Sequence, residues 1–190
     1  AVRAKSIVDS GDLGEVVLFD NIFASHAPMA GRWNADPAVS GGGVLIDNGT
    51  HSVDIARYFL GSITDVMAVA PRRVQDVAVE DTAQMFIRSA DGVCGTIDLS
   101  WSIDMQADRY ISIYGSHGTI NVGWHESKFR PAGGDWISFG DGYDKIGAMR
   151  AQVGNFCGAL QGREELLITA EDALASVAVI EAAYASMDGS

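Results

Sequence analysis

The segment from residue 93 to residue 104 alternates apolar and polar side chains over its whole length. One series is Val93, Gly95, Ile97, Leu99, Trp101 and Ile103, and the other is Cys94, Thr96, Asp98, Ser100, Ser102 and Asp104. A period of two residues is typical of a β-strand with one buried and one exposed face. The preceding Asp91-Gly92 pair is a strong signal for a two-residue turn, so we expect a hairpin here.

Strand signals dominate the chain from about residue 63 to residue 123. We expect strands at 14–24, 63–74, 82–89, 109–114 and 119–122, and no regular structure from about 124 to 144. Helical periodicity predicts helices over 2–8, from about 44 to 60, from 149 to 160, and from 169 onward. Runs of strands beside runs of helices indicate an α+β fold, an open, mostly antiparallel β-sheet with helices packed on one face.

The two C-terminal helices each carry an apolar stripe that we expect to be buried. The first stripe is Met149, Val153, Phe156, Cys157 and Leu160, and the second is Ala173, Val177, Ile180 and Tyr184. We therefore interpret Cys157 as a small core residue. Thr169 followed by Asp172 resembles a capping box at the start of the last helix.

Several predicted strands carry large apolar or aromatic side chains on both faces. Phe86 lies between Met85 and Ile87, and Tyr110 and Tyr114 flank Ile111 and Ile113. One layer of helices covers only one face of a sheet. We therefore expect the other face to meet a second copy of the chain, in a dimer or a tetramer.

The bulk composition excludes several classes of partner. The chain has 190 residues, enough for a single domain, and a net charge of −12, which argues against nucleic acid and anionic membranes as partners. The acidity is explained either by adaptation to high salt or by an ordinary solubilising surface, and we favour the latter. No segment is long and apolar enough to cross a membrane, and no signal peptide opens the chain, so we expect a cytoplasmic protein. Because the chain begins Ala-Val-Arg, it looks like a fragment or a processed product.

The run Ser40-Gly41-Gly42-Gly43 precedes a helix that brings three polar residues together. At about 100° per residue, Asp47, His51 and Asp54 fall within an arc of roughly 60°. A carboxylate beside an imidazole can move protons or hold a metal. The alternative is a structural one, in which the three residues are only the solvated polar stripe of an amphipathic helix. Glycines are costly unless the backbone bends sharply or something approaches closely, which favours a functional site. Three ligands on one helix face would subtend a narrow angle, so we predict no metal.

The remaining candidate groups carry weaker signals. His26, His117 and His125 are interpreted as surface or packing histidines, and Trp33 as either a core plug or a wall on which substrate stacks. The triple glycine lacks the G-x-G-x-x-G spacing of a dinucleotide site, and no βαβ unit surrounds it. Cys94 and Cys157 form neither a disulfide framework nor a zinc spacing.

These motifs together resemble one protein family. The residues that carry the resemblance are Trp33-Asn34-Ala35-Asp36-Pro37, the run from Ser40-Gly41-Gly42-Gly43 through Asp47 and His51 to Asp54, Gly61, the opening Ser10-Gly11-Asp12-Leu13-Gly14-Glu15-Val16, and the closing Thr169–Leu174 and Ala182–Ser186 segments. They resemble the C-terminal domain of the glucose–fructose oxidoreductase/inositol dehydrogenase/rhizopine-catabolism (Gfo/Idh/MocA) family. The resemblance spans essentially the whole chain.

The resemblance implies a fold, a reaction and a site. Family members are two-domain NAD(P)-dependent oxidoreductases of sugars, inositols and related polyols, with a C-terminal domain like that of dihydrodipicolinate reductase. By this resemblance, residues 1–190 form the substrate-binding and oligomerisation domain, with His51 and Asp47 catalytic and Asp54 orienting the imidazole. Arg32, Trp33, Asn34 and Asp54 would bind substrate.

The same resemblance places the nucleotide elsewhere. NAD or NADP is expected on an N-terminal Rossmann domain that carries a Glu-Lys-Pro lysine, and neither feature is present in these residues. We therefore expect the chain alone to bind no nucleotide and to be inactive. Many members have Trp-Arg before the glycines, whereas here Arg32 precedes Trp33 and Asn34 follows it. Alternatives are a stand-alone ligand-binding or dimerisation module, or a non-redox, glycoside-cleaving family member.

Overall fold

The computed structural model describes residues 1–105 and 107–188. Its centre is an eight-stranded, mostly antiparallel sheet. The strands are β1 (Val16–Ala24), β2 (Ile63–Val69), β3 (Thr82–Ser89), β4 (Cys94–Ser100), β5 (Arg109–Gly115), β6 (Gly118–Gly123), β7 (Ser127–Pro131) and β8 (Ile137–Gly140). Their order is β2-β3-β4-β1-β5-β6-β7-β8. Only β1 and β4 run parallel among these strands, so the N-terminal strand lies between two hairpin systems.

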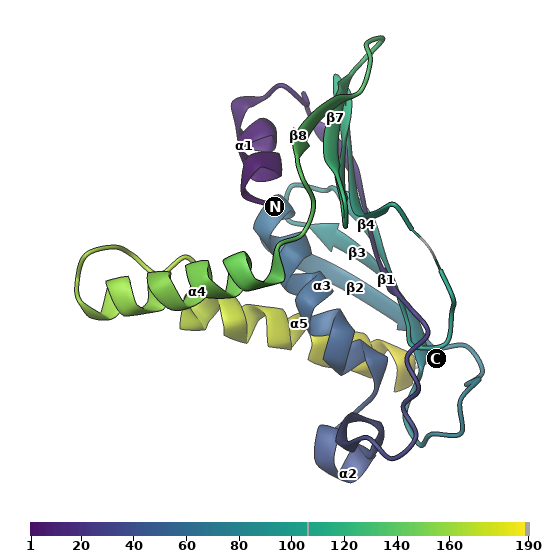
Figure 1. The fold of residues 1–190 in the computed structure, drawn as a ribbon. Coiled ribbons are helices and arrows are strands. Elements are labelled where there is room, and N and C mark those ends of the chain that lie inside the picture. Colours follow the sequence, from purple (N-terminus) through teal and green to yellow (C-terminus); the bar gives the residue numbers. More distant parts are fainter. Residues whose placement is uncertain (106, 189–190) are drawn as a thin grey trace.

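Two helices cover one face of the sheet (Figure 1). They are α3 (Val44–Leu60) and α5 (Ala170–Asp188), which contact each other and strands β1 to β4. Short helices α1 (Val2–Ser10), η1 (Trp33–Ala35) and α2 (Pro37–Ser40) lie outside this layer, and α4 (Lys145–Leu160) precedes α5. The predicted α+β class and its single helical layer are therefore confirmed.

The hairpin predicted at Asp91-Gly92 is present, and the alternation of β4 matches its burial. Gly92 has a φ of +85°, which a glycine adopts without steric cost. On β4, Gly95, Ile97 and Leu99 are buried against the helices. The other phase of β4 lies on the open face, where Asp98 accepts a hydrogen bond from Gln84 and Thr96 donates to Asp20.

Most predicted boundaries shift by a few residues, as where β4 ends at Ser100 and α4 begins at Lys145, and three regions differ more. Strand β2 ends at Val69 rather than at 74, because Pro71 cannot donate to a strand ladder. The stretch predicted to be irregular holds β7 and β8, a short hairpin whose strands of five and four residues show little periodicity. The loop before the glycine run contains η1 and α2, with Asp36 capping α2 through the Ala38 amide at 3.0 Å.

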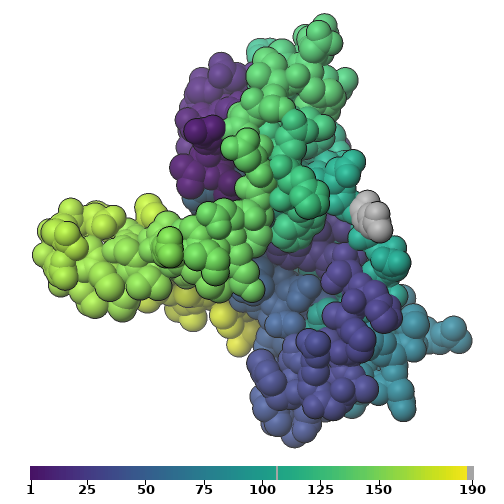
Figure 2. Space-filling model, in the orientation of Figure 1, coloured from purple at the N-terminus to yellow at the C-terminus, as the bar shows by residue number. Residues whose placement is uncertain are grey.

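The prediction of a buried stripe on α4 is wrong in this chain. Val153 and Leu160 are 61% and 74% exposed, and Cys157 is exposed rather than in the core. Helix α4 and the first part of α5 both project from the sheet (Figures 1 and 2). We call residues 145–169 the arm. The side chain of Asn155 holds its tip by hydrogen bonds to the backbone of Glu165 and Leu167.

The last helix is buried over only part of its length. Thr169 and Asp172 form the predicted capping box, with the Asp172 amide donating to Thr169 Oγ1 at 3.1 Å and the Thr169 amide donating to Asp172 Oδ2 at 3.0 Å. The predicted face is wrong at Ala173 and Val177, which are exposed, and right at Ile180. Burial begins about one turn later, where α5 reaches α3 and β2.

No helix among the described residues could cross a membrane, by length and apolar character.

Candidate functional site

The glycine run bends the chain sharply at the start of α3, and two other segments approach it closely. A Cβ at Gly42 would lie 2.1 Å from the Tyr184 hydroxyl, and one at Gly43 would lie 2.0 Å from the Glu80 carbonyl oxygen. Helix α3 and strand β4 also approach closely, because Gly49 would place a Cβ 3.1 Å from Leu99. The glycines are therefore required by packing around α3, as the sequence argument expected from a close approach.

Glu80 satisfies the first amides of α3 from outside the helix. Its Oε1 accepts hydrogen bonds from the amides of Gly43 (3.0 Å) and Leu45 (3.1 Å), and its carbonyl oxygen accepts from Val44 (2.9 Å). The Tyr184 hydroxyl donates to the same Oε1 at 2.7 Å. Burial, and then the hydrogen bond to the Glu80 carboxylate, raise the pKa of Tyr184 far above its usual value.

Asp47 and His51 follow one turn apart on α3. Asp47 is half-buried in the first turn, and its Oδ2 accepts a hydrogen bond of 3.3 Å from Asn34 of η1. His51 is exposed, and its imidazole makes no hydrogen bond within the described part of the chain. The carboxylate is thus held, whereas the imidazole is free to meet a ligand.

His51 lies between two hollows. The smaller, of about 260 Å³, is lined by the substrate-binding candidates Trp33 and Asn34 together with Asp47. The larger, of about 590 Å³, lies beyond the C-terminal end of β1 and includes Asn48 and Trp124. Four of the predicted site residues therefore meet at one place, namely His51, Asp47, Trp33 and Asn34.

The other two predicted site residues, Asp54 and Arg32, line neither of the hollows at His51. Asp54 is half-buried and accepts a hydrogen bond of 3.4 Å from Ser176 of α5, and neither hollow at His51 is lined by it. Arg32 is exposed and lines a separate hollow of about 520 Å³ on the other side of Trp33. Trp33 is 68% exposed, so it forms a wall between two hollows rather than a core plug.

Sequence reasoning missed the aromatic side of the larger hollow. Trp124 packs on Tyr110 with ring centroids 4.4 Å apart, and Phe23 stacks on Tyr110 at 5.6 Å. His125, which the sequence suggested was a surface histidine, lines this hollow with His51. These residues come from β1, β5 and the segment after β6, so only the strand order brings them together.

A buried hydrogen-bond network holds the loops beside the site. Asp81 is fully buried, and its Oδ2 accepts from the amides of Val74 and Gln75 and from the Ser102 hydroxyl, at 2.7–2.8 Å. The Gln75 amide group donates to the carbonyls of Ala27 and Trp101. Burial raises the pKa of Asp81, but these hydrogen bonds outweigh burial and bring the pKa below its usual value.

The polar groups at the site form no cluster of metal ligands in the described part of the chain and leave the first amides of α3 engaged. Among the described residues, no group of three His, Cys, Asp or Glu side chains could hold a metal ion. The amides at the start of α3, which could otherwise bind a phosphate, are already engaged by Glu80. The site therefore offers acceptors, an imidazole and aromatic walls, which suit a neutral ligand rich in hydroxyl groups.

Comparisons with known proteins place this geometry in context. The model of the GFO/IDH/MocA C-terminal domain matches residues 1–121. Inositol 2-dehydrogenase from Rhizobium meliloti is 26% identical over 98% of this chain and 58% of its own length. The chain spans less than two thirds of the curated relatives it matches first.

Two solved structures share the fold. An NAD binding oxidoreductase from Klebsiella pneumoniae has a TM-score of 0.88 at 21% identity, covering 100% of this chain and 61% of its own. A complex of levoglucosan dehydrogenase with NADH and levoglucosan has a TM-score of 0.84 at 19% identity, covering 98% and 60%. At these identities the structures show a common fold.

Proposed function

Because this chain belongs to the GFO/IDH/MocA family through its C-terminal domain, we propose that it binds the substrate of an NAD(P)-dependent oxidoreductase. The substrate class we propose is a sugar, an inositol or a related polyol. The observation that carries the proposal is the exposed His51, which lies between two hollows, one turn from a carboxylate that Asn34 holds in place.

Each side chain at the site has a role in this proposal. His51 accepts the proton of the hydroxyl group that is oxidised, and returns it in the reverse direction. Asp47 accepts hydrogen bonds from substrate hydroxyls. Trp33 and Trp124 offer flat apolar faces on the two sides, against which the C–H groups of a sugar ring can pack.

The hydride acceptor belongs to another part of the enzyme in this proposal. NAD or NADP, when bound, supplies that acceptor, and we assign it to a nucleotide-binding domain rather than to residues 1–190. The arm is the surface we assign to contact with that domain, since Met149, Val153 and Leu160 are at least half exposed at helical spacing. About 40% of the length of each relative named above lies outside the part that it shares with this chain, which leaves room for such a domain.

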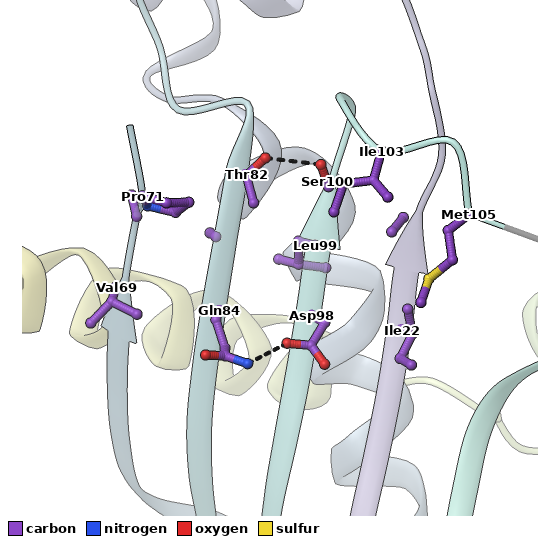
Figure 3. A pocket seen from close by; sticks show the side chains of 13 residues that line it. Ile22, Val69, Pro71, Thr82, Gln84, Asp98, Leu99, Ser100, Ile103 and Met105 are labelled. Atoms are coloured by element: carbon purple, nitrogen blue, oxygen red, sulfur yellow. Dashed lines mark hydrogen bonds between the residues drawn. The ribbon is translucent and has the colours of Figure 1, made fainter. Parts of the chain in front are cut away.

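We assign the open face of the sheet to a second copy of the chain. Figure 3 shows a hollow of about 440 Å³ on this face, with Ile22, Val69 and Met105 around it and the Gln84–Asp98 hydrogen bond on its floor. The polar side chains of this face are largely paired with one another, as in the Arg88–Asp65 ion pair, so apolar surface can be covered at little cost. Sedimentation of the purified chain as a strict monomer would overturn this assignment.

Binding of a neutral polyol to the isolated chain tests the substrate class. Titration of the ¹⁵N-labelled chain with myo-inositol or levoglucosan should shift the amide signals of Asn48 and His51 and the indole signals of Trp33 and Trp124. Shifts confined to other surfaces would contradict the proposal. NADH added under the same conditions should shift none of these signals.

Turnover tests the role of His51 when the chain acts with a nucleotide-binding domain. His51→Gln retains volume and polarity but loses the titrating group, so turnover should fall by about 10²–10⁴-fold. His117→Gln is the matched control, because His117 lies in the β5–β6 turn at the opposite end of β1. His125 is unsuitable as a control, since it lines the hollow with His51. Near-normal turnover in His51→Gln would contradict the proton-transfer role of His51. Polyol binding without any turnover in the unmodified chain with its nucleotide-binding domain would favour a binding module instead.

A further inference from the structure

The start of α3 depends on a carboxylate from outside the helix. Four backbone N–H groups at a helix N-terminus have no partner within the helix, and the N-cap side chain usually satisfies one of them. Here the N-cap is Gly43, which has no side-chain acceptor. Glu80 takes this role, with one oxygen that accepts from two amides of α3.

Among the described residues, hydrogen bonds rather than an ion pair hold the Glu80 carboxylate in place. Tyr184 donates to Oε1 from α5, and no ion pair among the described residues includes Glu80. A carboxylate at the positive end of a helix is favourable, and here it is half-buried, which reduces screening. Three segments of the chain therefore meet at one oxygen atom.

The amides that Glu80 Oε1 holds, those of Gly43 and Leu45, come just before Asp47 in the sequence. Asp47 is in the same first turn of α3, and its amide donates to the Gly43 carbonyl oxygen at 3.1 Å, the first hydrogen bond within the helix. His51 follows one turn later on the same side. A change in how Glu80 holds Gly43 and Leu45 would move or loosen the turn that carries Asp47, and with it the approach of His51 to both hollows.

We propose that Glu80 is a positioning residue for Asp47 and His51. It acts as a built-in anion that fixes the first two turns of α3, and the glycines at 42 and 43 exist to let Tyr184 and Glu80 reach this place. The link to catalysis rests on the proposed function, whereas the link to the geometry of α3 does not.

Two substitutions at this position separate the loss of the acceptor from the loss of the charge. Glu80→Ala removes both, and Glu80→Gln keeps an oxygen for the Gly43 and Leu45 amides. We expect hydrogen exchange of the amides of residues 47–51 to accelerate about tenfold in Glu80→Ala and less than about threefold in Glu80→Gln. The amides of residues 56–60, at the other end of α3, serve as the internal control and should change little.

Two further readouts distinguish positioning from general stability. In Glu80→Ala the ring signals of His51 should shift or broaden, and sodium acetate at high concentration should partly restore them, because acetate can occupy the space left by the carboxylate. Sodium chloride at equal ionic strength should not. Tyr184→Phe removes one donor without opening the N-terminus, and it should give a smaller acceleration at the same residues, which keeps the inference testable if Glu80→Ala does not fold.

Binding of myo-inositol separates a failure of this inference from a failure of the proposed function. If both hold, Glu80→Ala binds myo-inositol at least about fivefold more weakly than the unmodified chain, and Glu80→Gln within about twofold. If the unmodified chain binds no polyol, the proposed function fails, while exchange and the His51 signals still decide the positioning role. Unchanged His51 signals in Glu80→Ala, or faster exchange spread evenly over the sheet and α5, would overturn it.

Discussion

Helices α3 and α4 have nearly the same length and both carry an apolar stripe, yet the chain buries one and exposes the other. Eight residues of α3 are buried, from Val44 to Leu60, whereas α4 buries only Gly158. Helix α3 lies on the sheet and against α5, while α4 projects in the arm (Figure 1). Apolar periodicity thus identifies a face that needs cover, but it does not say whether the cover comes from the same domain.

We expect the largest difference in stability between the α3 region and the arm when one glycine in each is replaced by alanine. Gly43→Ala would place Cβ 2.0 Å from a backbone oxygen, which cannot move without shifting Glu80, so we expect a loss of about 4 kcal/mol or more. Gly154→Ala in α4 meets no atom within 4 Å and should stabilise the helix by about 0.5–1 kcal/mol. Urea unfolding of both variants measures this, and equal effects would show that the arm is packed.

Truncation of one leucine in each region gives the next largest difference. Leu99 on β4 is 1% exposed, so Leu99→Ala should cost about 3 kcal/mol through lost burial and a cavity. Leu160 is 74% exposed, so Leu160→Ala should change the free energy of unfolding by less than about 0.5 kcal/mol. A cost above about 2 kcal/mol at Leu160 would mean that the arm is covered in the isolated chain.

The next comparison concerns two aspartates, Asp81 beside the site and Asp144 at the start of α4, and how much the charge of each contributes to stability. Asp81 has a pKa below its unfolded value of about 3.9, so its stabilising effect is present above about pH 4 and is lost as pH falls through the folded pKa. Asp81→Asn should cost about 2 kcal/mol at pH 7, because a neutral amide oxygen accepts these three hydrogen bonds more weakly than a carboxylate oxygen and the added NH₂ donor must be buried. It should also weaken the pH dependence between 5 and 3.

The matched substitution is Asp144→Asn, at the N-cap of the arm's helix α4. Asp144 caps α4 through the Gly147 amide at 2.9 Å, and asparagine caps a helix about equally well, so stability should be unchanged. The midpoint of urea unfolding at pH 7 and pH 3 measures both variants. A similar loss in both would contradict the distinction drawn here.

Chemical labelling of the exposed cysteines should have the smallest effect on stability, and it tests whether another domain covers the arm. Cys157 is exposed on α4, so maleimide should react with it rapidly and change the free energy of unfolding by less than about 0.5 kcal/mol. Cys94, exposed on β4, is the internal reference. If the arm contacts a nucleotide-binding domain, adding that domain should slow the labelling of Cys157 and not that of Cys94. Equal rates would remove the support for that contact.

The sequence predicted those parts of the fold that depend on neighbouring residues. Alternation located β4, the Asp91-Gly92 pair located its hairpin, and the Thr169–Asp172 capping box located the start of α5. The runs of strands and helices predicted the α+β class, the resemblance to a known family agreed with it, and the structure confirms it. The roles of His51 and Asp47 stay predictions, although the structure brings both of them to one hollow.

Other features depend on residues far apart in the sequence and left no local signal. His125 and Phe23 share a hollow only because β1 lies beside β5, and Glu80 reaches Gly43 only because the chain returns to α3 before β3. The exposure of Cys157 could not be predicted from its stripe, because the stripe has the same spacing whether or not it is covered. Periodicity describes a face, and the tertiary structure decides its neighbours.

The position of β1 in the middle of the sheet has a consequence for how the chain folds. Phe19 pairs with Gly95 on one side and with Ile113 on the other, so neither neighbour exists until much of the chain has been made. Such distant pairing is slow, because loop-closure entropy must be lost before the contacts form. A nascent chain ending near residue 90 would expose both edges of β1, and these free edges make it the stage at which aggregation during synthesis is most expected.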